Sequence, residues 1–260
     1  MIDYSFSTSD LEYFLLIFTR VSCFVFIAPF FSTKNVPIRL RAGLSFFISL
    51  LLYSVITPHV VPEYSTVLGY AVLVLKEGIT GLLIGFGATI CNSIVLLAGK
   101  VADMEIGLSM VQLFDPLTNE ASGFVGGFYQ YAILVIMFVT NAHYYFIRAF
   151  CETYQLIPIG GVKINTEKLL TSLVQFMCDY VSIAFRICIP LVASILILNC
   201  LLGVLAKIAP QVNMFSVGIQ LKILVGMSVI FFTIGMLPNM ATYIFEEMKV
   251  MMTAFVYSMQ

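Results

Sequence analysis

The sequence predicts an all-α membrane protein, and three observations support that fold class. Of its 260 residues, 60% are hydrophobic and only 10% are charged, whereas a soluble domain carries about 25% charged residues. The mean hydropathy is +1.02. The apolar residues form long runs between short polar connections, and a helix needs about 20 apolar residues to cross a bilayer. We therefore expect membrane-associated helical hairpins.

Six apolar runs are long enough to be spanning helices. They are Leu11–Phe31, Leu44–Val61, Val67–Leu97, Phe124–Phe150, Leu169–Leu205 and Val217–Leu237. Pro190 lies inside the fifth run and predicts either a kinked helix or two stacked pieces. A seventh run, Ala241–Tyr257, contains acidic and basic residues. Such an amphipathic helix is typical of a membrane interface.

The charges of the connections give a partial topology. Ser32–Arg41 carries Lys34, Arg39 and Arg41, whereas Pro58–Thr66 has no lysine or arginine. By the positive-inside rule, the first connection faces the cytoplasm and the N-terminus lies outside. With six spans, the basic connection Arg148–Lys168 would face outside, against the same rule. We therefore expect some of these helices not to cross the bilayer in the ordinary way.

Charged residues inside the apolar runs need partners, because a charge facing lipid is costly. They are Arg20, Lys76, Glu77, Asp179 and Arg186. Asp179, Ser182 and Arg186 share one helical face by their spacing. Three interpretations of this face remain open. It is a buried polar seam that fixes helix packing, a proton or ion relay, or a contact with a partner subunit.

Small residues predict close helix packing in the third run. Gly78, Gly81 and Gly85 are followed at similar spacing by Ala88 and Asn92. This stripe lies on one helix face, and its G-x-x-x-G motif permits close backbone approach. The neighbouring helix belongs either to this chain or to another subunit.

The connection Gly99–Gly127 is glycine-rich and polar but contains the bulky apolar residues Met110, Leu113 and Phe114. A long connection in a membrane protein is often a lid or plug, and movable apolar groups suit a hydrophobic gate. The alternative is an ordinary exposed loop.

Further along, Lys207–Gly218 separates two long apolar runs. Pro210 is expected to end one helix, and Gln211 and Asn213 offer side-chain partners to open backbone groups in a hairpin turn.

Signals of catalysis are absent from the sequence. Neither His59 nor His143 belongs to a metal-binding or catalytic motif, and no nucleotide-binding loop occurs. The six cysteines form no close pair and are expected to be free, reduced thiols. No basic block indicates nucleic acid. We expect a protein that is not an enzyme and that binds no metal, cofactor or nucleic acid.

Five short patterns follow one another along nearly the whole chain. They are Arg20 with Ala28–Ser32 and Val36–Arg39; Lys76–Gly85; Gly99 with Asp103, Gly107 and Asp115–Pro116; Asn141–His143 with Ile157–Gly160; and Pro210–Phe215 with Gly218, Lys222 and Gly226. Together they resemble the FliR family, the R-type subunit of the flagellar and type III secretion export gate. The last pattern is the most specific.

This resemblance implies a subunit of a pore in the bacterial cytoplasmic (inner) membrane, at the flagellar basal body. Its partners would be P-type and Q-type subunits, with the B-type switch protein and the export ATPase nearby, and its cargo unfolded secreted proteins. Residues 1–165 would be P-like and contain the plug, and residues 166–260 would be a Q-like hairpin, both buried mainly by partner subunits.

The resemblance also implies roles for particular residues. Met110, Leu113 and Phe114 would fill the closed pore, and the turn with Pro210, Gln211, Asn213 and Phe215 would face the cytoplasm. The pattern Lys76–Gly85 resembles the flagellar branch more than a virulence injectisome. A secondary transporter, with Asp179 and Arg186 as its coupling site, is the alternative from composition alone.

Overall fold

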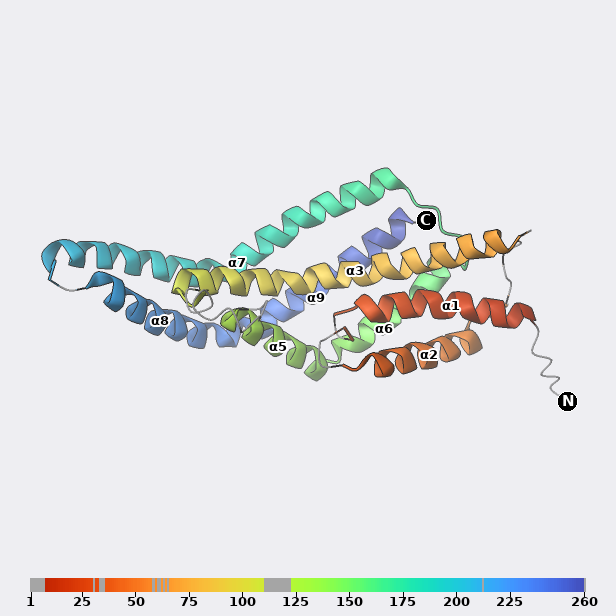
Figure 1. Cartoon of the computed structure of the whole chain (residues 1–260), viewed down its shortest axis with the longest axis horizontal. Coiled ribbons are helices and arrows are strands. Elements are labelled where there is room, and N and C mark those ends of the chain that lie inside the picture. Colours follow the sequence, from red (N-terminus) through yellow and green to blue (C-terminus); the bar gives the residue numbers. More distant parts are fainter. Residues whose placement is uncertain are drawn as a thin grey trace. The chain divides into compact units, whose positions relative to one another are not determined.

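The computed structural model describes residues 8–29, 31–32, 36–57, 59, 62, 64, 66–109, 123–211 and 213–259. Its helices are α1 (Thr8–Ile27), α2 (Ile38–Val55), α3 (Val67–Ile106), α5 (Phe124–Val139), α6 (Ala142–Leu156), α7 (Thr166–Ile208), α8 (Met214–Thr233), the short 3-10 helix η1 (Ile234–Met236) and α9 (Leu237–Ser258) (Figure 1). No strand occurs in these described ranges. The predicted all-α class is confirmed.

Several helix boundaries differ from the predicted apolar runs. The run Phe124–Phe150 is broken at Asn141, whose backbone has a left-handed conformation with φ of 55°; asparagine tolerates this region better than most residues. Around Pro190 the structure has the single helix α7 rather than two pieces. The connection expected from Gly99 begins later, because α3 continues to Ile106.

In the described part of the chain, four helical segments are long and apolar enough to cross a membrane: Ile38–Val55, Val67–Ile106, Thr166–Ile208 and Phe215–Ser258. The broken pair α5 and α6 would make a fifth span. Helix α1 is not among them, and it carries Asp10, Glu12 and Arg20. Among the described residues the structure thus has four or five candidate spans, fewer than the six predicted, because the first run, in α1, is not one of them. The seventh run, predicted to lie at a membrane interface, is joined to the sixth in the segment Phe215–Ser258.

The chain forms two compact units. The first unit comprises Met1–Ile90, Asn141–Phe176 and Glu246–Gln260. In it α1 and α2 lie side by side, as Figure 1 shows. Aromatic rings fill their interface, with Phe14 and Phe46 at 5.6 Å between ring centroids. On another face of α1, Phe24 stacks on Phe150 of α6 at 4.2 Å. Burial of such rings supplies much of the packing energy of a helical core.

The second unit comprises Cys91–Thr140 and Met177–Phe245. Its core contains aliphatic residues of α3, α5 and α7, among them Ile94, Ile133 and Ile195. In this unit α8 runs back along the end of α7 as a hairpin, which Figure 1 shows. A Cβ added at Gly218 of α8 would lie 3.5 Å from a Leu202 methyl group, so the two helices are in contact.

Candidate functional site

The predicted plug residues Met110, Leu113 and Phe114 lie outside the described residues. The structure does describe the chain on both sides of them. Helix α3 ends at Ile106, and Gly107 follows with φ of 92°, a left-handed conformation that favours glycine. The hydroxyl of Ser109 donates to the carbonyl oxygen of Asp103 at 3.2 Å. Helix α5 then begins at Phe124.

Asp103 connects these two ends within the second unit. Its carboxylate is buried and accepts from the Val125 amide, at 3.1 Å for one oxygen and 3.2 Å for the other. Gly123, the N-cap residue of α5, has no side chain to perform this task. A carboxylate at a helix N-terminus satisfies open amide groups and faces the positive end of the helix dipole. Asp103 therefore caps α5 from the neighbouring helix α3.

A second contact brings α3 and α5 together next to this cap. A Cβ at Gly99 would collide with the backbone of Gly126, and one at Gly123 would collide with the Asp103 carboxylate. Glycine at these positions lets the two backbones approach closely. The end of α3 and the start of α5 are thus held together. They flank the connection that carries the predicted plug residues.

Arg20 and Glu77 form a buried ion pair in the first unit. The guanidinium Nε of Arg20 lies 2.5 Å from the Glu77 carboxylate, and both side chains are 0% exposed. A buried charge requires both a counter-charge and hydrogen bonds to its remaining polar atoms. Sequence reasoning predicted that each residue needs a partner, but it did not pair them across 57 positions.

The same ion pair holds the connection after α6. Arg20 Nη1 donates to the Ile157 carbonyl oxygen at 3.0 Å, and the Gly160 amide donates to Glu77 at 2.8 Å. The Arg20 guanidinium also lies 4.3 Å from the ring centroid of Tyr154, within the range of a cation–π contact. The patterns around Arg20, Lys76–Gly85 and Ile157–Gly160 therefore meet in one buried network.

The glycine stripe of α3 faces α1. A Cβ at Gly81 would collide with the backbone carbonyl oxygen of Arg20, and one at Gly85 would lie 3.1 Å from that of Phe24. At Gly78 the added atom would be at an ordinary 3.6 Å from Cys23 and Thr19. Of the two predicted alternatives, a neighbour within the chain accounts for these contacts.

The three residues of the predicted polar seam lie on α7 in the second unit. Asp179 is half-buried, and Ser182 and Arg186 are exposed. In the part of the chain that the structure describes, neither Asp179 nor Arg186 forms an ion pair; the two pairs found there are Arg20–Glu77 and Arg148–Glu152. A hollow of about 260 Å³ beside Arg186 is lined by Asn239 and Tyr243 of α9.

In the hairpin turn between α7 and α8, Asn213 plays the capping role expected from the sequence, whereas no such hydrogen bond of Gln211 occurs among the described residues. Helix α7 ends at Ile208, two residues before Pro210. Asn213 is the N-cap of α8, and its side-chain oxygen accepts from the amides of Phe215 at 3.2 Å and Ser216 at 3.5 Å. Gln211 and Phe215 are exposed. That this turn faces the cytoplasm stays a prediction.

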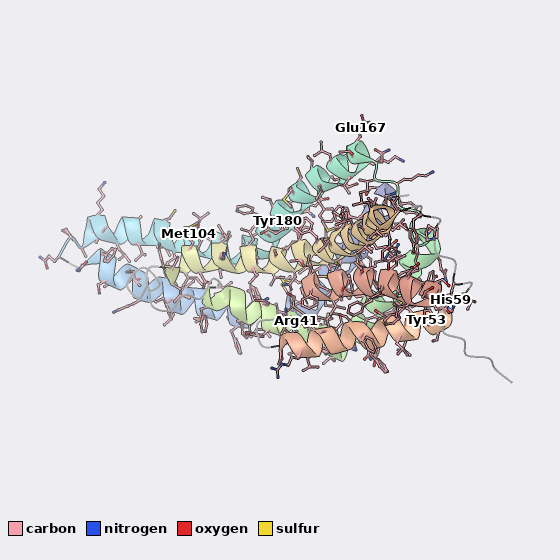
Figure 2. The ribbon with its side chains drawn as sticks, turned by 45° about the vertical axis from the view of Figure 1, so that its right-hand side comes forward. Arg41, Tyr53, His59, Met104, Glu167 and Tyr180 are labelled. Atoms are coloured by element: carbon pink, nitrogen blue, oxygen red, sulfur yellow. The ribbon has the colours of Figure 1, made fainter. Side chains whose placement is uncertain are left out.

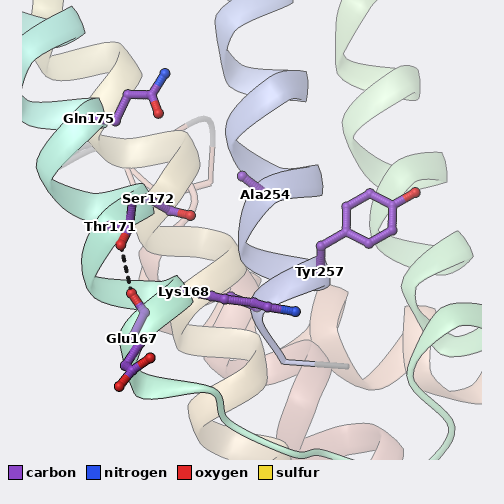
Figure 3. A pocket seen from close by; sticks show the side chains of 8 residues that line it. Glu167, Lys168, Thr171, Ser172, Gln175, Ala254 and Tyr257 are labelled. Atoms are coloured by element: carbon purple, nitrogen blue, oxygen red, sulfur yellow. Dashed lines mark hydrogen bonds between the residues drawn. The ribbon is translucent and has the colours of Figure 1, made fainter.

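A polar groove lies at the start of α7 in the first unit. It has a volume of about 810 Å³ between α7 and the end of α9, and Figure 3 shows Lys168, Ser172 and Gln175 on one wall and Tyr257 on the other. The hydroxyl of Thr171 donates to the Glu167 carbonyl oxygen at 2.9 Å. Hydroxyl and amide groups, rather than titratable groups converging on one point, make up most of this lining.

Both histidine rings lie against tyrosine rings. His59 stacks on Tyr53 with ring centroids 4.1 Å apart, and its Nε2 lies 2.9 Å from the Tyr53 carbonyl oxygen (Figure 2). His143 lies against Tyr144 at 4.2 Å. Among the residues placed by the structure, no three histidine, cysteine or acidic side chains are grouped as metal ligands.

Long apolar helices, close glycine contacts and polar groups used for packing define the class of a helical membrane protein. Residues 11–248 match the family model described as "Bacterial export proteins, family 1". The chain belongs to this family.

Three curated relatives show the same similarity, and each is named "Flagellar biosynthetic protein FliR". The protein from Bacillus subtilis (strain 168) is 33% identical over 227 residues, which cover 84% of this chain and 87% of the relative. The one from Escherichia coli (strain K12) is 25% identical and covers 88% and 86%. That from Aquifex aeolicus (strain VF5) is 26% identical and covers 90% and 89%. The predicted resemblance to the FliR family is confirmed.

Proposed function

We propose that this chain is an export-gate subunit of a bacterial flagellar type III secretion apparatus. It forms part of the pore through which unfolded flagellar proteins cross the cytoplasmic membrane. The observation that carries this proposal is the family match over residues 11–248. The flagellar names of the relatives favour the flagellar system over a virulence injectisome.

The exposed apolar helix faces support a role within a larger assembly. Ile38 and Val55 at the two ends of α2 are 68% and 75% exposed, and Phe232 of α8 is 79% exposed. Apolar side chains exposed to this extent on long apolar helices are expected to contact lipid or another protein. We propose that P-type and Q-type subunits cover much of it. The division into a P-like part at 1–165 and a Q-like part at 166–260 stays a prediction.

Met110, Leu113 and Phe114 are proposed to plug the closed pore. Flexible methionine and bulky apolar side chains can seal an irregular channel and yield to a passing chain. The described cap from Asp103 to Val125 and the contact between Gly99 and Gly126 support this role, because they anchor both ends of the connection. The chain itself is proposed to catalyse nothing, so the driving energy comes from other components.

The test compares three strains of the source bacterium that carry altered forms of this chain. Loss of the whole chain is expected to abolish secretion of flagellar proteins without a membrane leak. Deletion of Met110–Phe114 is expected to let small ions leak through the assembled pore. Deletion of Thr118–Ser122 shortens the same connection by the same length but keeps the three apolar residues, so the closed state should hold.

Flagellar secretion and membrane conductance decide between the outcomes. Normal secretion without the chain would contradict the export function. An unchanged conductance after removal of Met110–Phe114 would contradict the plug. Loss of uptake of one small solute, with secretion intact, would instead favour the secondary transporter.

A further inference from the structure

We propose that a groove between α6 and α9 in the first unit binds one anionic phospholipid. The phosphate group contacts Arg148 and Lys249, and an acyl chain lies along the apolar part of the groove. This site goes beyond the proposed export function and does not depend on it, because it requires only that the chain lies in a membrane.

The groove is formed by two helices that can be embedded in a bilayer. Helix α9 belongs to the candidate span Phe215–Ser258, and α6 belongs to the broken pair that would form the fifth span. Helix α5 has no charged residue, whereas α6 carries Tyr144 and Tyr145, which are 64% and 58% exposed, and then Arg148. Exposed tyrosines beside a basic residue, next to an apolar segment, are typical of the headgroup level of a membrane. The start of α6 is therefore suited to meet phospholipid headgroups.

The groove has a net positive charge, because two bases and one acid line it. Arg148 of α6 donates from Nε to the Glu152 carboxylate at 2.9 Å, but a guanidinium has further N–H donors that can bind a phosphate oxygen. The Nζ of Lys249 in α9 lies 4.8 Å from the ring centroid of Tyr145 and forms no ion pair within the described residues. Bases from two facing helices thus converge on one groove, and charge complementarity assigns it an anion.

The apolar part of the groove begins about two helical turns from these bases. Leu156 follows Arg148 by eight residues in α6, and Val256 follows Lys249 by seven in α9. Such spacings correspond to about 10–12 Å along a helix axis. Met252 and Val256 are buried at 3% exposure each, and Leu156 is 42% exposed. A charged group at one end and apolar side chains toward the other define an amphiphilic ligand.

Other occupants match the groove less well. Its volume is about 330 Å³, at the low end of the range of about 300–1,000 Å³ for small-molecule sites. A helix of another protein has a diameter of about 10–12 Å and cannot enter such a groove. A zwitterionic headgroup would bring its own cation close to Lys249. The acids that precede this lysine, Glu246 and Glu247, would repel an anion, but neither lines the groove.

The experiment uses the full chain, expressed with the other membrane subunits of its apparatus and reconstituted into vesicles. The vesicles contain equal amounts of phosphatidylglycerol, which is anionic, and phosphatidylcholine. Tyr257, which Figure 3 shows directed from α9 toward the green ribbon of α6, is replaced by the photo-cross-linking residue p-benzoylphenylalanine. Mass spectrometry then identifies the adduct. Phosphatidylglycerol adducts should exceed phosphatidylcholine adducts about fivefold or more, since each base near an anionic headgroup contributes about that factor in affinity.

Charge variants test whether the two bases cause this preference. The double variant Arg148→Gln with Lys249→Gln should give adducts close to the ratio of the vesicles. Lys163→Gln is the matched control, because Lys163 is an exposed base of the same unit that does not line the groove, and it should keep the preference. Adducts at the vesicle ratio with both bases present, or adducts to another protein subunit, would overturn the proposal. An unchanged preference in the double variant would do so as well.

Thermal unfolding in detergent is an independent readout. Added phosphatidylglycerol should raise the unfolding temperature of the wild-type complex but not that of the double variant, because a ligand stabilises only the state that binds it. Phosphatidylcholine and inorganic phosphate should raise neither. Without added lipid, both complexes should unfold alike and contain the same subunits, which shows that the double variant folds. An equal rise with inorganic phosphate would show that the site binds a simple anion rather than a lipid.

Discussion

Arg20 and Glu77 show how single residues hold the first unit together. Taking two charges out of water carries a large desolvation penalty, which their attraction offsets only with good geometry and further hydrogen bonds. This pair has two such bonds, to the Ile157 carbonyl and the Gly160 amide, whereas the buried Nη2 of Arg20 has no hydrogen-bond partner among the described residues. The pair therefore specifies where the connection after α6 lies against α1 and α3, in addition to any stability it contributes.

Removing one member of this pair should be more harmful than removing both. Arg20→Ala leaves Glu77 buried without its counter-charge, and such losses cost about 3–5 kcal/mol of folding free energy. The double variant Arg20→Met with Glu77→Leu should recover part of this loss, because no unpaired charge remains. The measurement is the thermal unfolding of the purified complex in detergent.

The exposed pair Arg148–Glu152 is the matched control for that measurement. Its nitrogen–oxygen distance is 2.9 Å, but its side chains are 78% and 55% exposed. Solvent screening limits such a pair to about 0.3–0.5 kcal/mol, so Arg148→Ala should hardly change the unfolding temperature. Equal effects of Arg20→Ala and Arg148→Ala would show that the buried network does not stabilise the fold.

These charged residues could be identified in the sequence because they lie inside apolar runs. Which of them pair with each other could not. Arg20, Lys76 and Glu77 all lie in apolar runs, so each was expected to need a partner. The sequence alone leaves open whether Lys76 or Glu77 faces the helix that carries Arg20. The choice depends on which side of α3 faces α1, and tertiary packing determines that rotation. Asp103 was likewise part of a pattern, but its capping of α5 depends on the approach of two separate helices.

At the scale of elements, the packing of α3 on α1 depends on the absence of a side chain at Gly81. The atom that an added Cβ would meet is the backbone carbonyl oxygen of Arg20, which cannot rotate away as a side chain can. Any larger residue must push the two helices apart. Their separation would also strain the nearby pair of Arg20 and Glu77.

Alanine substitutions along the chain should therefore have graded effects. Gly81→Ala is expected to destabilise the folded complex by about 1–3 kcal/mol through overpacking. Gly78→Ala places its methyl group at an ordinary 3.6 Å and should be tolerated. Gly43→Ala in α2 meets nothing within 4 Å and should be neutral or stabilising, since alanine favours helix by about 1 kcal/mol over glycine.

The measurement is recovery and thermal unfolding of the three alanine variants in parallel. A Gly81→Ala complex as stable as the Gly78→Ala complex would show that α1 and α3 can separate without cost. The larger replacements Gly81→Leu and Gly85→Leu should prevent assembly altogether.

Elements were predictable from the sequence to differing extents. Hydrophobic runs located α2, α3, α7 and α8 because a membrane helix needs a long apolar stretch. The break at Asn141 was missed, since a single left-handed residue leaves no trace in hydropathy. Helix α3 continued past Gly99 because that glycine packs against Gly126 rather than starting a loop. Composition alone cannot distinguish these two uses of glycine.

At the scale of the whole molecule, the helices differ in how far the chain buries them. The most apolar stretch of α3 is 56% buried, whereas those of α2, α7 and Phe215–Ser258 are each 17% buried. Helix α3 is thus largely covered by the chain itself, and the others present apolar faces outward. This distribution fits a subunit whose fold is completed by neighbours in the membrane, as the family membership leads us to expect.

The most direct test of the export-gate function is the native mass of the purified protein. The chain is expressed alone and together with the other membrane subunits of its export apparatus, and each preparation is extracted in mild detergent. We predict that the chain alone is unstable, and that co-expression yields a hetero-oligomer of defined mass containing this chain with P-type and Q-type subunits. A stable monomer that does not associate with those subunits and that binds a small solute would contradict the proposed function.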